Sequence, residues 1–145
     1  MNRMSWIKTN FLWMMYRAGW ATKPNQERIL AIKITRQGFE EILSKAINSS
    51  HSTSNTKSDE VRLQWDPDHN PDGSKVESGR RAIQLGLRGD MLMKFSKEFI
   101  VEINDITSFV IGQKENISNL SLLTIPLETI YNISNEDLAN RINLS

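Results

Sequence analysis

The clearest pattern in the chain is an apolar run near the amino terminus, residues 11–16 (FLWMMY), with helix signals on both sides. Thr9 or Asn10 can cap a helix over residues 11–18, and Gly19 stands where a left-handed residue would end it. Six consecutive apolar residues leave no polar stripe in the middle of such a helix. We therefore expect it to be buried on most sides.

Two further regions combine a strand with a helix. Residues 27–34 (ERILAIKI) carry apolar side chains on both faces, which is typical of a central strand covered on both sides. Thr35 can then cap a helix that ends near Ile47, because apolar residues follow at helical spacing. Later in the chain, residues 99–103 (FIVEI) predict another strand, and Asp105 can cap the helix after it.

Residues 61–66 (VRLQWD) and 82–87 (AIQLGL) alternate between apolar and polar or small side chains, as strands with one buried face do. If they pair, their second faces bring together hydrogen-bonding side chains and two very small ones: Arg62, Gln64, Asp66, Gln84, Ala82 and Gly86. Small residues beside hydrogen-bonding ones let a ligand approach the backbone closely. The alternative is the solvated face of an antiparallel sheet, and alternation alone favours it.

The remaining elements are short. Asp90 can begin a helix, and residues 122–133 are expected to be extended, with Pro126 restricting them to a sheet edge. Ser134 can cap a last helix that ends near Ile142.

Two polar stretches separate these elements. Residues 48–59 are rich in Ser, Thr and Asn and predict a mobile surface loop, while residues 67–80 predict a loop between the two alternating strands. No internal repeat is visible. The elements together predict one α+β domain over residues 1–145, with a mixed, mostly antiparallel sheet and helices packed on it.

The amino-acid composition excludes several kinds of catalytic and metal site. The chain has no cysteine, which excludes disulfides, thiolate catalysis and cysteine zinc sites. Its two histidines, His51 and His69, lie in loop-like sequence, so no histidine triad or metal site is expected. A net charge of +1 gives no overall attraction to nucleic acid or to a membrane. Neither a signal peptide nor a membrane-spanning segment is expected, which favours the cytoplasm.

One motif resembles the first half of a calcium-binding loop. Residues 68–73 (DHNPDG) match its opening positions, which supply oxygen ligands and a glycine for the turn. Gly79 occupies the twelfth position, where the loop needs a bidentate Glu. The same residues are also common turn formers, so we expect a turn and no metal.

Positive charge and tryptophan are concentrated in residues 3–27, a stretch without an acidic residue before Glu27. Its cations and indoles are Arg3, Lys8, Arg17, Lys23, Trp6, Trp13 and Trp20. We expect either an anionic or stacking ligand here, or later acids that fold back onto the stretch.

Individual residues of this stretch have different expected positions. Trp13 is expected in the core, whereas Trp6 and Trp20 lie outside the predicted helix and are freer to line a cleft. Arg17, near the end of that helix, can pair with a core carboxylate, which is the favoured outcome, or reach a bound anion.

Five segments form a pattern over nearly the full chain: RMSWIKTNFLWMMYRAGWATKPNQE, LAIKITRQGFE, VRLQWDPDH, RAIQLGLRG and IVEINDIT. This pattern resembles the uncharacterised family known as domain of unknown function 4291. Members of that family usually begin earlier, with a further strand and a short helix. One expectation is therefore an inactive, truncated remnant.

The order of elements is also distantly similar to ADP-ribosyltransferase-like folds, which hold NAD or a nucleotide. This similarity implies a nucleotide- or NAD-utilising enzyme, in which cations neutralise phosphates and Trp6 or Trp20 stacks on a base. The implied ligand-binding residues are Arg3, Trp6, Lys8, Arg17, Trp20, Lys23 and Arg81.

Two residues of the alternating strands have implied catalytic roles in such an enzyme. Gln84 would hydrogen-bond ribose or nicotinamide, and Asp66 would stabilise developing positive charge or accept a proton. The alternative partner is RNA or single-stranded nucleic acid, bound without catalysis by the same basic, aromatic stretch. The sequence leaves the substrate and the oligomeric state open.

Overall fold

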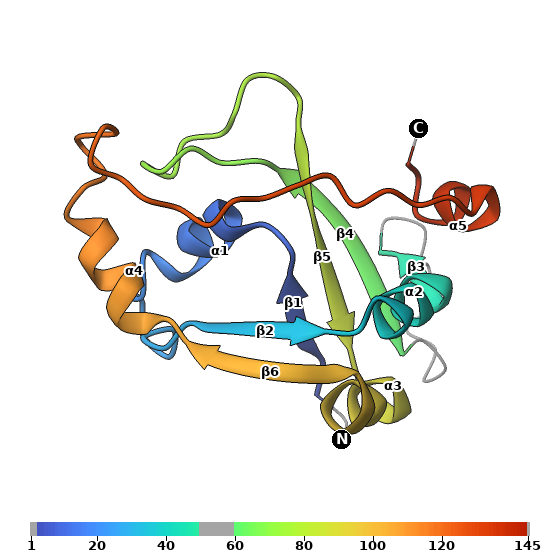
Figure 1. The fold of residues 1–145 in the computed structure, drawn as a ribbon. Coiled ribbons are helices and arrows are strands. Elements are labelled where there is room, and N and C mark those ends of the chain that lie inside the picture. Colours follow the sequence, from blue (N-terminus) through green and yellow to red (C-terminus); the bar gives the residue numbers. More distant parts are fainter. Residues whose placement is uncertain (1–2, 50–59, 145) are drawn as a thin grey trace.

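The computed structural model describes residues 3–49 and 60–144 and contains two β-sheets (Figure 1). The strands are β1 (Ser5–Lys8), β2 (Leu30–Ile34), β3 (Ala46–Asn48), β4 (Val61–Pro67), β5 (Arg81–Leu87) and β6 (Ile100–Asp105). The helices are α1 (Phe11–Ala18), α2 (Arg36–Lys45), α3 (Gly89–Lys94), the π-helix η1 (Phe95–Phe99), α4 (Thr107–Lys114) and α5 (Glu136–Arg141). The predicted α+β class is confirmed.

The larger sheet has four strands in the order β1-β5-β4-β3. Its centre is the antiparallel pair of β4 and β5, matched from Val61 opposite Leu87 to Pro67 opposite Arg81. β1 adds to β5 in antiparallel orientation, and β3 adds to β4 in parallel. The predicted strands over residues 61–66 and 82–87 are confirmed, and residues 68–80 connect them.

β2 and β6 form a separate two-stranded antiparallel ribbon. The expectation of a central strand covered on both sides is wrong, because Leu30 is 51% and Ile32 38% exposed. The large apolar residues inside β2 share one face, since they alternate with Ala31 and Lys33. Ile29, which gave the second face its apolar character, precedes the strand and is buried elsewhere.

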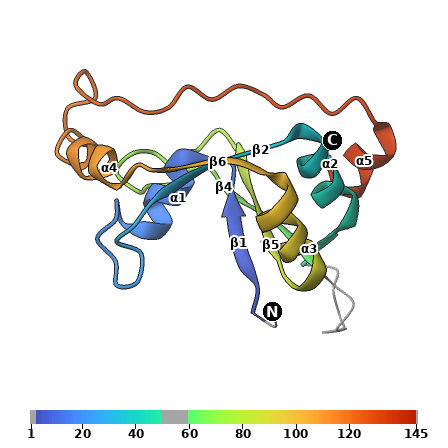
Figure 2. The same ribbon diagram turned by 60° about the horizontal axis from the view of Figure 1, so that its bottom comes forward.

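The main hydrophobic core lies on one side of the four-stranded sheet. Alternate residues of β4 and β5, including Val61, Leu63 and Leu85, point into it. Helices α2, α3 and α5 close this side, with Ile42 and Ile142 fully buried (Figure 2). The opposite side of the sheet consequently keeps the polar residues of the same strands.

A smaller core joins α1 to α4 and to the start of β2. Met15 and Ala18 of α1 pack there with Ile29 and with Val110 of α4. Helix α1 is therefore anchored in the smaller core, while Trp13 on the same helix lies near Lys8 of β1.

Both ends of α1 are as predicted. The side chain of Asn10 accepts a hydrogen bond from the Trp13 backbone N–H at 2.7 Å, and Gly19 ends the helix with a φ of 58°. Trp20 and Ala21 continue with φ values of 55° and 64°. Three successive left-handed residues are unusual, and two of them carry a Cβ atom, so this turn is strained.

Residues 122–134, here called the strap, run in extended form from the α4 region across the molecule to α5 (Figures 1 and 2). The extended conformation is as expected, although the strap pairs with no strand in the described part of the chain. Asn135 caps α5 in place of Ser134. Of the predicted loop over residues 48–59, residues 50–59 lie outside the described part.

None of the helices in the described ranges is long and apolar enough to cross a membrane.

Candidate functional site

The register of the four-stranded sheet brings three long polar side chains into one row. Lys8 of β1 is opposite Gln84 of β5, and Gln84 is opposite Gln64 of β4. Asp66 lies two residues further along β4 and so points to the same side. We call this side of the sheet, away from the main core, the polar face.

Gln84 is the centre of a hydrogen-bond network on the polar face. Its Nε2 atom donates to Gln64 Oε1 at 2.8 Å and to Asp66 Oδ2 at 2.5 Å. Both amide hydrogens are thereby engaged, and the amide is held in one orientation. Among the described residues the Gln84 Oε1 atom has no donor, so it is the atom that can accept a hydrogen bond from a ligand.

Lys8 lies at the meeting point of the polar face and α1. Its Nζ atom is 5.3 Å from the centre of the Trp13 ring. Burial lowers the pKa of Lys8, and the neighbouring Arg17 guanidinium lowers it further, while Asp66 opposes both effects. Two cations thus stand near one carboxylate, and the local charge is positive.

Arg17 has no carboxylate partner in the part of the chain that the structure describes. The favoured expectation was an ion pair with a core carboxylate, and no such pair is found there. The side chain is exposed on the last turn of α1, one residue after Tyr16. It is therefore available to an anion that approaches Lys8.

Trp6 covers the small residue that was expected to admit a ligand. A Cβ atom on Gly86 would lie 2.5 Å from Met4 Sδ and 2.9 Å from Trp6 Cε2. Gly86 therefore makes room for side chains of the chain itself. Trp6 is half-buried.

The other predicted ligand-binding residues are not gathered at the polar face. Trp20 is 5% exposed, and its Nε1 atom donates to the Pro71 carbonyl at 3.0 Å, so it belongs to the smaller core. Lys23 donates to the Tyr16 carbonyl at the end of α1. Arg3 precedes β1, at the opposite end of that strand from Lys8.

The loop between β4 and β5 closes one end of the polar face. The imidazole of His69 stacks on the Tyr16 ring, with 3.9 Å between centroids. His69 is buried, and its Nδ1 atom has no hydrogen-bond partner among the described residues. Sequence reasoning missed this stacked pair, because nothing in the sequence connects an exposed helix position with a distant loop.

The resemblance of residues 68–73 to a calcium loop has a structural explanation. Asp68 is buried and accepts two hydrogen bonds from Arg80, at 2.7 and 3.1 Å. Asp72 accepts from the backbone N–H and hydroxyl of Ser74, as in an ordinary turn. These carboxylates are engaged by the loop itself.

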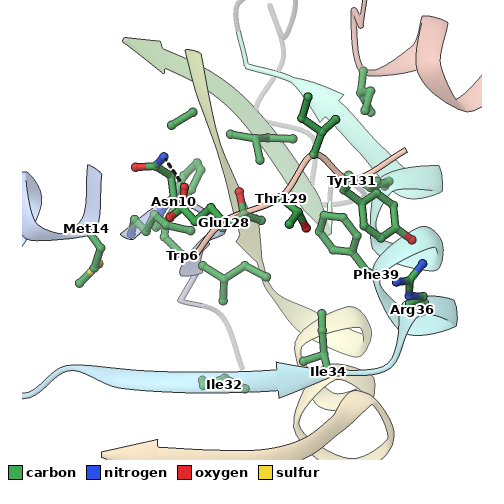
Figure 3. Close-up of a pocket in the computed structure, with 18 of the residues that line it drawn as sticks. Trp6, Asn10, Met14, Ile32, Ile34, Arg36, Phe39, Glu128, Thr129 and Tyr131 are labelled. Carbon is green, nitrogen blue, oxygen red and sulfur yellow. Dashed lines mark hydrogen bonds between the residues drawn. The ribbon is translucent and has the colours of Figure 1, made fainter. Parts of the chain in front are cut away.

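A cleft of about 900 Å³ lies on the other side of β1 (Figure 3). One wall is the apolar face of the ribbon, which contributes Ile32 and Ile34 to the lining, and α2 supplies Phe39. The strap crosses it with Glu128 and Tyr131. The predicted residues that line this cleft are Trp6, Lys8 and Arg81.

Comparison with known proteins gives one match. Residues 1–131 match the model of a family described as a domain of unknown function, DUF4291. No curated protein and no solved structure matches the chain. Because the match covers most of the sequence and confirms the resemblance seen in its motifs, this chain belongs to the DUF4291 family.

Proposed function

We propose that this chain binds a nucleotide or NAD at the polar face, and that it uses the bound molecule in a group transfer of the ADP-ribosyltransferase type. The observation that carries the proposal is that two cations, Lys8 and Arg17, lie near a single carboxylate, Asp66. Burial, and to a lesser extent the Arg17 guanidinium, lowers the pKa of the Lys8 ammonium, and an anion that binds beside it would stabilise its charged form. Phosphate is an anion that Lys and Arg commonly bind together.

The remaining residues of the polar face have roles that follow from their hydrogen bonds. The Gln84 Oε1 atom can accept from a ribose hydroxyl or a carboxamide N–H, since both of its amide hydrogens are engaged. Asp66 stands beside it and would stabilise positive charge that develops on the ribose when the leaving group departs. The half-buried indole of Trp6 is the early tryptophan best exposed for stacking on a base.

Small ligands fit this geometry better than a nucleic-acid strand does. Single-strand binders stack successive bases on exposed aromatic rings. Here Trp13 and Trp20 are 6% and 5% exposed, and one face of Tyr16 is covered by His69. We therefore retain nucleic-acid binding only as an outcome of the test. The proposal also places the chain in the cytoplasm, a compartment in which nucleotides are abundant.

The test is thermal denaturation of the chain with NAD, ADP-ribose, ADP and AMP, each at about millimolar concentration. We expect at least one of them to raise the Tm by the mass-action effect of a ligand that binds only the folded state. Arg17→Ala should abolish the shift. Arg3→Ala, a cation of the same stretch that lies away from Lys8, should leave it unchanged.

Two outcomes would count against the proposal. If no nucleotide changes the Tm, the polar face is not a nucleotide site. The chain would instead be a nucleic-acid binder if it binds single-stranded RNA with an affinity that falls steeply with salt, and if Arg3→Ala and Arg17→Ala weaken that RNA binding equally. Release of nicotinamide from NAD, and its loss in Asp66→Asn, would distinguish an enzyme from a simple binder.

A further inference from the structure

Strands β2 and β1 both border the cleft, but they present different sides to it. Within β2, every second residue lines it, namely Leu30, Ile32 and Ile34. A strand that presents one face to a space does so with alternate residues. The residues from Trp6 to Asn10 line the cleft without interruption. An unbroken run of lining residues means that β1 presents its main-chain edge.

The order of the sheet explains why this edge is open. β1 is the outermost strand, and on its outer side no strand pairs with it in the described part of the chain. β1 ends at Lys8, opposite Gln84, so the same side of β5 is left without a strand partner from Ile83 back to Arg81. Arg81, Ala82 and Ile83 accordingly also line the cleft in an unbroken run.

The main-chain edge of β1 borders a space with one apolar wall. The opposite wall consists of Ile32 and Ile34, and Phe39 and Trp65 also contribute to the lining. Main-chain polar groups in apolar surroundings require hydrogen-bond partners. A hydrocarbon ligand could fill the cleft without supplying those partners. An extended peptide can supply them, and its alternate side chains can cover the apolar wall.

The charges around the cleft select the kind of peptide. Arg36 and Arg81 line it, and neither forms an ion pair within residues 3–49 and 60–144. The acidic residue of the lining, Glu128, is already held by the Phe11 backbone N–H at 2.7 Å and by Asn10 at 3.2 Å. An occupant with acidic side chains therefore complements the cleft.

We propose that the cleft binds an extended peptide of a partner protein, which adds to the four-stranded sheet along β1. Alternate apolar side chains of the peptide contact Ile32, Ile34 and Phe39, and an acidic residue reaches Arg36 or Arg81. The strap limits the length of the bound segment at the Asn10 end, where Glu128 is anchored. This surface shares Trp6 and Lys8 with the proposed nucleotide site, but Ile32, Ile34 and Phe39 take no part in that site, so either proposal can fail without the other.

Selection from a displayed library of random heptapeptides on the purified chain tests the proposal. We expect enriched sequences that alternate apolar residues with polar ones and contain an acid. Ile32→Asp places a charge in the cleft wall and should bind the enriched peptides about tenfold more weakly or worse. Ile103→Asp is the matched control, because this residue shares the apolar ribbon face and is not among the lining residues.

Backbone methylation distinguishes strand addition from simple apolar contact. N-methylation of the peptide at alternate residues that face β1 should weaken binding about tenfold, whereas N-methylation at the intervening residues should not. Arg81→Glu, at an exposed position, should shift the selected sequences from acidic to basic.

Three results would overturn the proposal. The first is that the wild-type chain enriches no peptides more strongly than the Ile32→Asp variant does, provided that circular dichroism shows this variant to be folded. The second is an affinity that is insensitive to N-methylation in both sets of positions. The third is saturable binding of palmitate that Ile32→Asp removes while no peptide is enriched, because the cleft would then be a lipid site.

Discussion

Gly38 and Gly112 both lie inside helices, but the space around them differs. We therefore expect substitution by alanine to have opposite effects on stability at the two positions. A Cβ atom on Gly38 of α2 would lie 2.4 Å from Phe99 Cγ, which places that aromatic ring directly against the helix backbone. A Cβ atom on Gly112 of α4 meets nothing within 4 Å. Neither glycine has a positive φ, so only the space around it matters.

Gly38→Ala should therefore destabilise the chain by about 1–3 kcal/mol, because a buried ring must move to admit the methyl group. Gly112→Ala should stabilise it by up to about 1 kcal/mol through helix propensity. Urea denaturation of both variants measures the difference. Equal effects would mean that Phe99 does not pack on α2 as described.

At the scale of elements, the sequence predicted those features that depend on contacts between residues close together in the chain. Asn10, Gly19 and Thr35 cap their helices through contacts with near neighbours, and the sequence predicted them. β1 and β3 were missed. β1 (SWIK) is short and has one β-branched residue, and it is a strand because β5 offers it an edge.

In the candidate site, too, the sequence predicted the features set by one strand's alternation and missed those that depend on tertiary contacts. Alternation in β4 and β5 predicted that Gln84 and Asp66 share a face, and their hydrogen bond confirms that placement. The meeting of Lys8 with Arg17 depends on how α1 packs against the sheet, which is a tertiary contact. The stacking of His69 on Tyr16 likewise has no local sequence signal.

Asp105 connects three elements and makes the junction sensitive to acid. Its carboxylate accepts from the hydroxyl and backbone N–H of Thr107 at the start of α4, and from Arg28 ahead of β2. The Thr107 hydrogen bonds, with Arg28 contributing less, lower the pKa of Asp105 to about 2. Because the folded-state pKa lies below the unfolded value, this carboxylate stabilises the fold above about pH 4, and the contribution is lost as the pH falls towards 2.

Asp105→Asn should therefore lower the Tm near neutral pH, and the difference from the wild type should shrink as the solution is acidified through about pH 4 to 2. Thr107→Val removes the largest cause of the pKa shift and should flatten the same part of the profile. A constant Tm difference at all pH values would show that the carboxylate charge plays no part in joining the ribbon to α4.

At the scale of the whole molecule, the strap connects the ends of the two cores. Leu123 packs with the smaller core, and Ile133 packs with the main core. Between these ends, Tyr131 lies edge-on to Phe39, and its hydroxyl donates to Glu40 at 3.2 Å. Other strap side chains make few contacts with the fold, and Ile130, for example, is 88% exposed.

Glu128 is the polar anchor in the middle of the strap, at the amino-terminal end of α1. Glu128→Gln should reduce stability by about 0.5–1 kcal/mol, because it removes a negative charge from a helix amino terminus. Limited proteolysis within residues 122–134 should become faster. Leu127→Ala is the control, since this neighbouring side chain is 93% exposed and its loss should change neither property. Equal proteolysis of both variants would show that Glu128 does not hold the strap.

The position of Lys8 above Trp13 has an optical consequence. The emission wavelength of an indole depends on the electric field across its ring, and an ammonium group held against that ring contributes strongly to the field. An anion that binds at Lys8 would cancel part of this contribution. The chain therefore carries its own spectroscopic reporter, and a change in Trp13 emission would record occupancy of the polar face without any attached dye.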